Sequence, residues 1–125
     1  MADVVTTRPG QAAENFVAAQ LQSCGWQILA RNKRTPFAEV DLFALPPPLG
    51  SALVLVEVKA RHPLSWAQHE LSLGWKQRRR LARALLFEAN RLRWGGEIRA
   101  DLALVELDAG RPKSWQLVEG IDLLD

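Results

Sequence analysis

Apolar and polar positions follow two different periods along this chain. Residues 12–24 carry apolar side chains at helical spacing, and Gly25 suits the position just after a helix. The apolar stripe of that helix consists of Ala13, Val17, Leu21 and Cys24. Residues 52–61 instead form a run rich in β-branched side chains that is apolar on both alternating faces, which is typical of a strand buried on both sides. The pattern therefore predicts helix combined with a buried sheet.

The remaining strand-like segments extend this pattern to an α/β fold. Residues 38–43 form a strand that a Pro-rich connection joins to residues 52–61, as an antiparallel hairpin with a long loop. Further strands are predicted at residues 26–30, 98–107 and 115–118. With a second helix after the hairpin, the order is αβββαβ(β). This order predicts a two-layer or three-layer α/β sandwich, in which helices flank a mixed central sheet.

The second helix is predicted over residues 73–93. Ser72 fits its N-cap, and Gly95 and Gly96 end it. At about 100° per residue, one arc is expected to face the core, and it consists of Trp75, Ala82, Leu85, Leu86, Ala89 and Leu92. A basic group lies on the far side of the helix and consists of Lys76, Arg79, Arg80 and Arg83.

Length and composition limit the class of protein. A chain of 125 residues predicts one domain, residues 1–125, with a mobile lead-in at residues 1–9. The single cysteine, Cys24, cannot form an internal disulfide and indicates a reducing, cytoplasmic location. No apolar run approaches the roughly 20 residues that span a bilayer. The N-terminus lacks the basic and apolar regions of a signal peptide, so no membrane partner is expected.

Basic residues are concentrated in one part of the chain. The formal net charge is only +2, yet residues 76–93 contain seven basic residues and one acid, Glu88. Such a block suggests a surface that faces a polyanion such as nucleic acid, although the solvated face of a helix would look similar. Arg31, Lys33 and Arg34 form a smaller basic group, which we assign to the same surface.

Two acids and a lysine stand out at the end of the predicted hairpin. Glu57 and Lys59 alternate with core positions of the buried strand, and Asp41 lies on the partner strand. A buried charge is costly unless it is paired or holds a metal. Two interpretations stay open from these residues alone. One is a nuclease-like metal site, and the other is an ion pair between Glu57 and Lys59 with Asp41 solvated at an edge.

The metal-site interpretation has a definite chemistry. Phosphodiester hydrolysis uses a hard divalent cation to neutralise charge on the phosphate and to activate water. Mg²⁺ (or Mn²⁺) takes oxygen ligands, usually one or two carboxylates with waters and substrate oxygens. Asp41 and Glu57 would supply the carboxylates, and the carbonyl of Val58 would be a third protein ligand. Lys59 would orient the attacking water or offset charge on the phosphate.

Together these landmarks resemble the YraN family of small bacterial proteins. The family consists of predicted endonucleases related to archaeal Holliday-junction resolvases, within the PD-(D/E)-x-K nuclease superfamily. The resemblance covers residues 10–107 and departs at Ala38, where the family pattern has glycine. Its motifs are Gly10 with Ala13-Glu14, Gly25 with Arg31-Asn32, Glu39-Val40-Asp41-Leu42, Val56-Glu57-Val58-Lys59 with Arg61, and Lys76.

The resemblance implies a restriction-endonuclease-like fold and a metal-dependent, structure-selective DNA endonuclease that acts as a two-fold homodimer. The active-site set that it implies is Glu14, Asp41, Glu57 and Lys59. The position of Glu14 alone indicates only an acid near a helix start. The expected nucleic-acid contacts are Arg31, Lys33, Arg34, Arg61, Lys76, Arg79, Arg80 and Arg83.

Several alternatives stay open beside this hypothesis. The fold could hold nucleic acid without cutting it, or the chain could be a protein–protein adaptor. Glu39 shares a face with Asp41, as a further ligand or only as a repelling carboxylate. His62 and His69 are assigned to the surface or to loops. Trp66 could stack on an unpaired base, but packing is the expected role for it and for Trp26, Trp75, Trp94 and Trp115.

Overall fold

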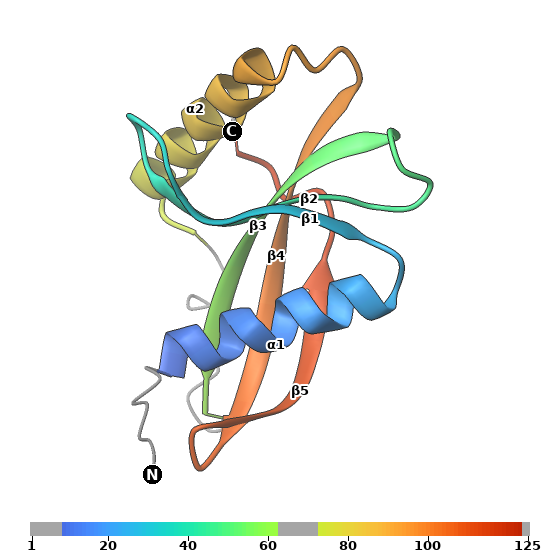
Figure 1. Cartoon of the computed structure of the whole chain (residues 1–125). Coiled ribbons are helices and arrows are strands. Elements are labelled where there is room, and N and C mark those ends of the chain that lie inside the picture. The colour runs from blue at the N-terminus through green and yellow to red at the C-terminus, as the bar shows by residue number, and fades with distance from the viewer. Residues whose placement is uncertain (1–8, 63–72, 124–125) are drawn as a thin grey trace, which may run out of the picture.

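A computed structural model of the chain describes residues 9–62 and 73–123 (Figure 1). In this part of the chain, two helices and five strands follow one another. They are α1 (Pro9–Ser23), β1 (Gln27–Arg34), β2 (Glu39–Leu45), β3 (Ala52–Arg61), α2 (Trp75–Arg91), β4 (Glu97–Asp108) and β5 (Arg111–Val118). The predicted element order, including the fifth strand, is confirmed.

The strands form one sheet in the order β1-β2-β3-β4-β5. β3 and β4 run parallel, and every other neighbouring pair is antiparallel. A parallel pair needs a crossover connection, and here α2 lies within it. The predicted α/β fold with a mixed central sheet is therefore confirmed, as is the antiparallel hairpin of β2 and β3.

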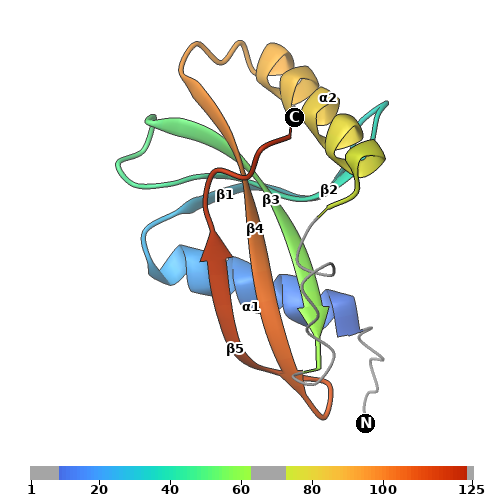
Figure 2. The same cartoon turned by 180° about the vertical axis from the view of Figure 1, so that it is seen from behind.

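The two helices cover opposite faces of the sheet (Figures 1 and 2). α1 packs on the face that contains Val54 and Val56. α2 packs on the face that contains Leu53 and Leu55. All four side chains are fully buried, which stabilises the fold by about 1.5–3 kcal/mol for each of them. This half of β3 is thus buried on both faces, as its sequence predicts.

β1 and β2 run steeply across the direction of β3, β4 and β5 (Figure 1). β2 consequently pairs with β3 over a short stretch, from Leu42 opposite Val56 to Ala44 opposite Val54. The pairing of β3 with β4 continues along the whole strand as far as Arg61. The end of β3 from Glu57 onward therefore extends past its pairing with β2.

Several predicted boundaries move. β1 continues to Arg34 instead of ending at Ala30, because its basic residues pair with β2 at the edge of the sheet, where exposed polar side chains are tolerated. α1 begins at Pro9, a residue type suited to a first helical turn. The rest of the expected mobile lead-in at residues 1–9 lies outside the described residues. Cys24 follows α1 and is exposed, so it is not part of the buried stripe.

The predicted core-facing arc of α2 was partly wrong. Trp75, Leu86 and Leu92 are 57%, 51% and 37% exposed, while Leu81 and Ala84 are buried instead. The apolar surface of α2 is wider than the part that the sheet covers. The helical period alone therefore does not decide which of the apolar residues face the sheet. α2 has Gly74 as its N-cap, and the predicted cap Ser72 lies outside the described residues. Neither helix in residues 9–62 and 73–123 is long and apolar enough to cross a membrane.

Candidate active site

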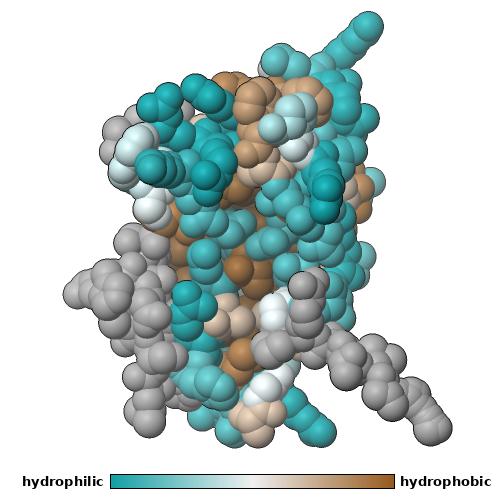
Figure 3. Space-filling view, turned by 90° about the vertical axis from the view of Figure 1, so that its left-hand side faces the viewer, coloured by the Kyte–Doolittle hydropathy of each residue, from teal (hydrophilic) through white to brown (hydrophobic). Residues whose placement is uncertain are grey.

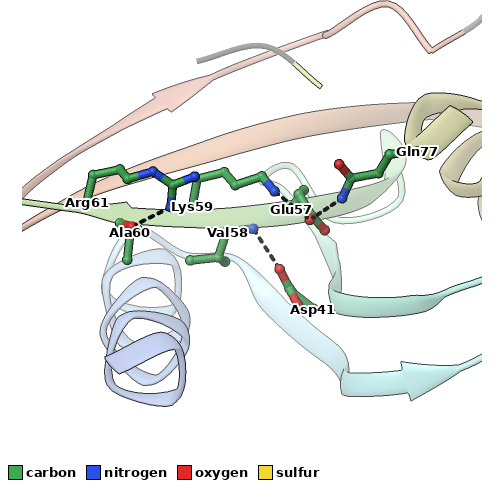
Figure 4. A network of polar contacts seen from close by, with 7 residues as sticks. All are labelled: Asp41, Glu57, Val58, Lys59, Ala60, Arg61 and Gln77. Atoms are coloured by element: carbon green, nitrogen blue, oxygen red, sulfur yellow. Dashed lines mark hydrogen bonds and ion pairs between the residues drawn. The ribbon is translucent and has the colours of Figure 1, made fainter. Parts of the chain in front are cut away.

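The site begins where β2 separates from β3. The register of the two strands would place Asp41 opposite Glu57, one pair beyond Leu42 and Val56. Asp41 has no such backbone pairing with β3. Its side chain instead accepts a hydrogen bond from the next free amide of β3. The Val58 N–H donates to Asp41 Oδ2 at 2.8 Å (Figure 4). The Asp41 carboxylate therefore accepts the hydrogen bond that a neighbouring strand would otherwise accept, and this bond holds Asp41 against β3.

The carbonyl of Val58 faces the same gap. In an extended strand the N–H and C=O of one residue point to the same side, as the exchange of both bonds within an antiparallel pair requires. Because the Val58 N–H points to Asp41, its C=O is directed towards the space that β2 has left. The predicted third oxygen ligand thus lies beside the predicted first one.

Glu57 lies on the opposite face of β3 from Val58, towards α2. It is only 8% exposed. Its Oε2 accepts a hydrogen bond from Gln77 Nε2 at 3.0 Å and lies 3.7 Å from Lys59 Nζ (Figure 4). Glu57 and Lys59 are thus an ion pair, as one of the two interpretations expected, but a largely buried one next to a second acid.

Glu14 reaches the gap from α1. Its Oε1 is buried and has no hydrogen-bond partner within the described residues. Burial and then the nearby charge of Asp41 raise the pKa of Glu14 to about 7, against smaller opposing effects of Asn32 and Arg31. The structure therefore brings Glu14 and Asp41 together, although they come from different elements.

Glu57 is subject to the same repulsion. Burial and then the charge of Asp41 raise its pKa to about 8, and the ammonium of Lys59 opposes this rise. Asp41 contributes to the raised pKa of both glutamates, so it is the middle member of a row of three carboxylates. A row of this kind repels itself when all its members are ionised.

Three features of this row fit a hard divalent cation. The donors are oxygen atoms of carboxylates and a backbone carbonyl. The Glu14 oxygen is buried and has no partner among the residues that the structure describes, and a cation would relieve the repulsion. Within residues 9–62 and 73–123, however, no three His, Cys, Asp or Glu side chains form a ready group for a metal ion. The fit therefore depends on few protein ligands with waters completing the shell, which is the usual arrangement for Mg²⁺.

The expected basic surface divides into separate parts. Lys76, Arg79, Arg80 and Arg83 are all exposed and line one shallow hollow on α2, together with Trp75. Elsewhere, Arg31 donates to Asn15 on α1, Lys33 lies near Glu88 of α2, and Arg34 is exposed near the end of β1. Arg61 ends β3 and donates to the carbonyl of Ala60.

Gln77 is a further residue at the row of acids, because it contacts Glu57. Sequence reasoning missed it, since its only signal was its place in the first turn of the basic helix. Glu39 is exposed opposite Arg34 at the start of β2, and His62 is exposed after β3. Trp66 and His69 lie outside the described residues. Figure 3, which faces the side where α1 and α2 begin, shows mainly hydrophilic side chains with apolar ones visible between them.

Comparisons with known proteins place the chain in a family. A model of the uncharacterised protein family UPF0102 matches residues 13–105. A UPF0102 protein of Granulibacter bethesdensis is 39% identical over 103 residues, which cover 81% of this chain and 62% of that protein. A UPF0102 protein of Pseudomonas putida is 37% identical over 119 residues, which cover 92% of this chain and 94% of that protein.

Among solved structures, a repair endonuclease from Pyrococcus abyssi matches with a TM-score of 0.45 and 18% identity, over 88% of this chain and 42% of that one. A likeness of this size has no bearing on activity. The match of the family model and the identity to two relatives agree with each other and with the resemblance in the sequence. The chain belongs to the UPF0102 family, the YraN family of that resemblance.

Proposed function

We propose that the chain is a divalent-metal-dependent endonuclease that hydrolyses phosphodiester bonds, with DNA as the expected substrate. One observation carries the proposal. Where β2 leaves β3, the acids Glu14, Asp41 and Glu57 come together beside a backbone carbonyl and Lys59. Clustered, partly buried carboxylates destabilise a fold unless a cation or a proton offsets their charge. A site that binds a metal can tolerate this destabilisation, because the cation offsets the charge when it is bound.

Asp41, Glu57 and the Val58 carbonyl would hold the cation, with Glu14 beside Asp41. When bound, Mg²⁺ or Mn²⁺ would neutralise charge on the phosphate and lower the pKa of a water. Two hydrogen bonds orient the carboxylates of the site. The Val58 amide fixes Asp41, and Gln77 fixes Glu57, so both carboxylates are oriented before a substrate arrives.

Lys59 is the side chain best suited to the reaction itself. Its ammonium lies 3.7 Å from Glu57 and is 24% exposed, so it is held by the site and can still reach a substrate. Hydrolysis forms a bond from a water oxygen to phosphorus and breaks the bond to the leaving sugar oxygen. In that step Lys59 would hold the attacking water in place or offset the charge that grows on the phosphate oxygens.

The test is a cleavage assay with duplex, flap, single-stranded and four-way-junction DNA, each with Mg²⁺, Mn²⁺ or EDTA. We expect metal-dependent cleavage that Glu57→Gln reduces by about 10²–10³-fold or more, because this variant removes a charge that holds the metal and so weakens stabilisation of the transition state. The matched control is Glu106→Gln. Like Glu57, Glu106 is an acid with a lysine partner and a hydrogen-bond partner, here Lys113 and Ser114, and it is half-buried on β4.

The outcomes of this assay separate the proposal from its rivals. Equal rates for the wild type and Glu57→Gln would show that the row of acids does not catalyse the reaction. Binding of DNA without cleavage under every metal condition would identify a non-catalytic binding module. The same panel tests one finer part of the proposal, which is selectivity for branched DNA. Action as a two-fold homodimer and a cytoplasmic location are further parts of the proposal, to be tested by the mass of the protein in solution and by fractionation of cells.

A further inference from the structure

Trp75 is a large apolar side chain in an unusual position. It begins α2 and is 57% exposed, although the helical period predicted that it packs against the core. A single exposed apolar side chain is common and needs no explanation by itself. Its surroundings are what distinguish Trp75, because its neighbours on the exposed side of α2 are cations.

Two positive charges lie against the tryptophan ring. Lys76 Nζ and the guanidinium carbon of Arg79 are each 5.8 Å from the ring centroid, within the range of a cation–π contact. With Arg80 and Arg83 they line a hollow of about 170 Å³. These four basic residues are exposed, and residues 75–83 contain no acid.

This combination of an accessible ring and exposed cations fits a strand of nucleic acid with unpaired bases. Base–aromatic stacking works for any base, because every base has a π-face, and the cations follow the phosphates. In a duplex the faces of the bases are already stacked on one another, so the ring would have no partner there. A ligand with only negative charge would use the cations and leave the ring unexplained.

We propose that Trp75, Lys76 and Arg79 form a binding site for an unpaired nucleotide, with the base on the ring and the flanking phosphates on the two cations. This inference rests on the proposed function, because it names the class of substrate. The substrate would be nucleic acid with a single-stranded segment, such as a flap, a gap or an open branch.

The helix fixes where that segment lies relative to the candidate active site. Gln77, two residues after Trp75, contacts Glu57 on the sheet side of α2. At about 100° per residue, Trp75 and Gln77 point to opposite sides of the helix. The stacked base would therefore lie at least one helix diameter, roughly 10–12 Å, from Glu57. Because the strand must pass around the helix, at about 3.4 Å per stacked nucleotide the base would be at least roughly three nucleotides from the bond to be cut.

The test measures binding without cleavage, in EDTA, with a fluorescein-labelled oligothymidylate and with a blunt duplex of equal length. We expect Trp75→Leu to weaken binding of the oligothymidylate by about 5- to 150-fold, the usual effect of losing one stacked base. Trp75→Phe should restore most of the loss, because it keeps an aromatic face. Affinity for the duplex should not change. Leu86→Ala, at a 51% exposed apolar position on the same helix, is the matched control and should bind like the wild type.

The dependence on salt separates stacking from charge. Trp75→Leu should leave the slope of log K against log salt unchanged. The double variant Lys76→Gln/Arg79→Gln should reduce that slope by about 1.4, at roughly 0.7 per phosphate contact on a single strand. Equal affinity of the wild type and Trp75→Leu for the oligothymidylate would overturn the inference, as would an equal loss on both probes. Because no metal is present, this result is independent of whether the chain cleaves DNA.

Discussion

The two halves of β3 have the same neighbour on one side and different neighbours on the other. Both halves pair with β4 without interruption. The first half, ending at Val56, also pairs with β2 and is buried on both faces. From Glu57 onward the pairing with β2 is absent, and burial decreases towards Arg61. A single change, the departure of one neighbouring strand, thus converts a core strand into the wall of a site.

The two halves of β3 differ in what satisfies their polar groups. In the first half, backbone polar groups are satisfied by neighbouring strands and side chains fill the space between the helices. In the second half, the Val58 amide is satisfied by the Asp41 carboxylate, and polar side chains occupy the space towards α2. Substitutions in the first half should therefore affect stability, and those in the second half should affect activity and metal binding.

The largest effect is expected in the first half. Leu55 is fully buried in the cluster beneath α2, so Leu55→Ala should lower the free energy of unfolding by about 2–5 kcal/mol, through lost burial and a cavity. Urea denaturation measures this change. Leu29→Ala, at a 37% exposed position on β1, is the control and should stay within about 0.5 kcal/mol of the wild type. Similar losses for the two variants would contradict the comparison.

The sequence predicted the alternation that gives β3 its two faces, because each face is a local property of successive residues. It also predicted that Asp41 and Glu57 lie on paired strands. It could not show that β2 crosses β3 steeply and leaves it at Glu57, since that angle depends on how the β1–β2 hairpin packs in three dimensions. For the same reason Gln77 was missed, and Trp75 was assigned to the core. Which arc of α2 meets the sheet is decided by tertiary contacts.

In the second half, Lys59→Met should separate activity from stability. The ion pair with Glu57 is 3.7 Å long and largely buried, but the pKa of Glu57 is about 8, so Glu57 can take up a proton when Lys59 is absent. The free energy of unfolding should therefore fall by much less than the roughly 3–5 kcal/mol that an unpaired buried charge costs. Cleavage should fall by about 10²–10³-fold, the usual effect of removing one group that stabilises the transition state. Lys113→Met is the matched control, because Lys113 lies 4.0 Å from an acid and is 58% exposed. Unaltered cleavage by Lys59→Met would exclude the proposed role.

Metal binding should stabilise the second half of β3. With Mn²⁺ at a hundredfold excess over Kd, the wild type should gain about 2.7 kcal/mol, while Asp41→Asn should gain much less. In EDTA the variant should melt at the same temperature as the wild type or higher, because it lacks a repelling charge and its amide oxygen can still accept from Val58. Asp108→Asn, at an exposed acid that ends β4, is the control. Thermal scans in which Mn²⁺ leaves the wild type unchanged would reject the metal site.

The smallest effect is a dependence of stability on pH in EDTA. In the folded chain the pKa of Glu14 is about 7 and that of Glu57 about 8, against 4.5 in the unfolded chain. Between these values the folded state retains protons that the unfolded state has released, so the free energy of unfolding must fall as pH rises. The loss begins above pH 4.5 and is complete above about pH 8. At about 1.36 kcal/mol per pKa unit, the two shifts in full would amount to about 5 kcal/mol between pH 5.5 and 8. Water at this partly open site screens the charges, so we expect about 1–2 kcal/mol of that loss to be observed.

Glu57→Gln makes this dependence specific to the row of acids. The variant removes the group with the higher pKa and keeps an oxygen that can accept the hydrogen bond of Gln77, so its stability should change less over the same pH range. Taking the difference between the two curves cancels the titration of groups that both proteins share. Parallel curves would show that Glu57 is not held protonated by its surroundings. A wild type that becomes more stable from pH 5.5 to 8 would mean that attraction to Lys59 outweighs both burial and the charge of Asp41.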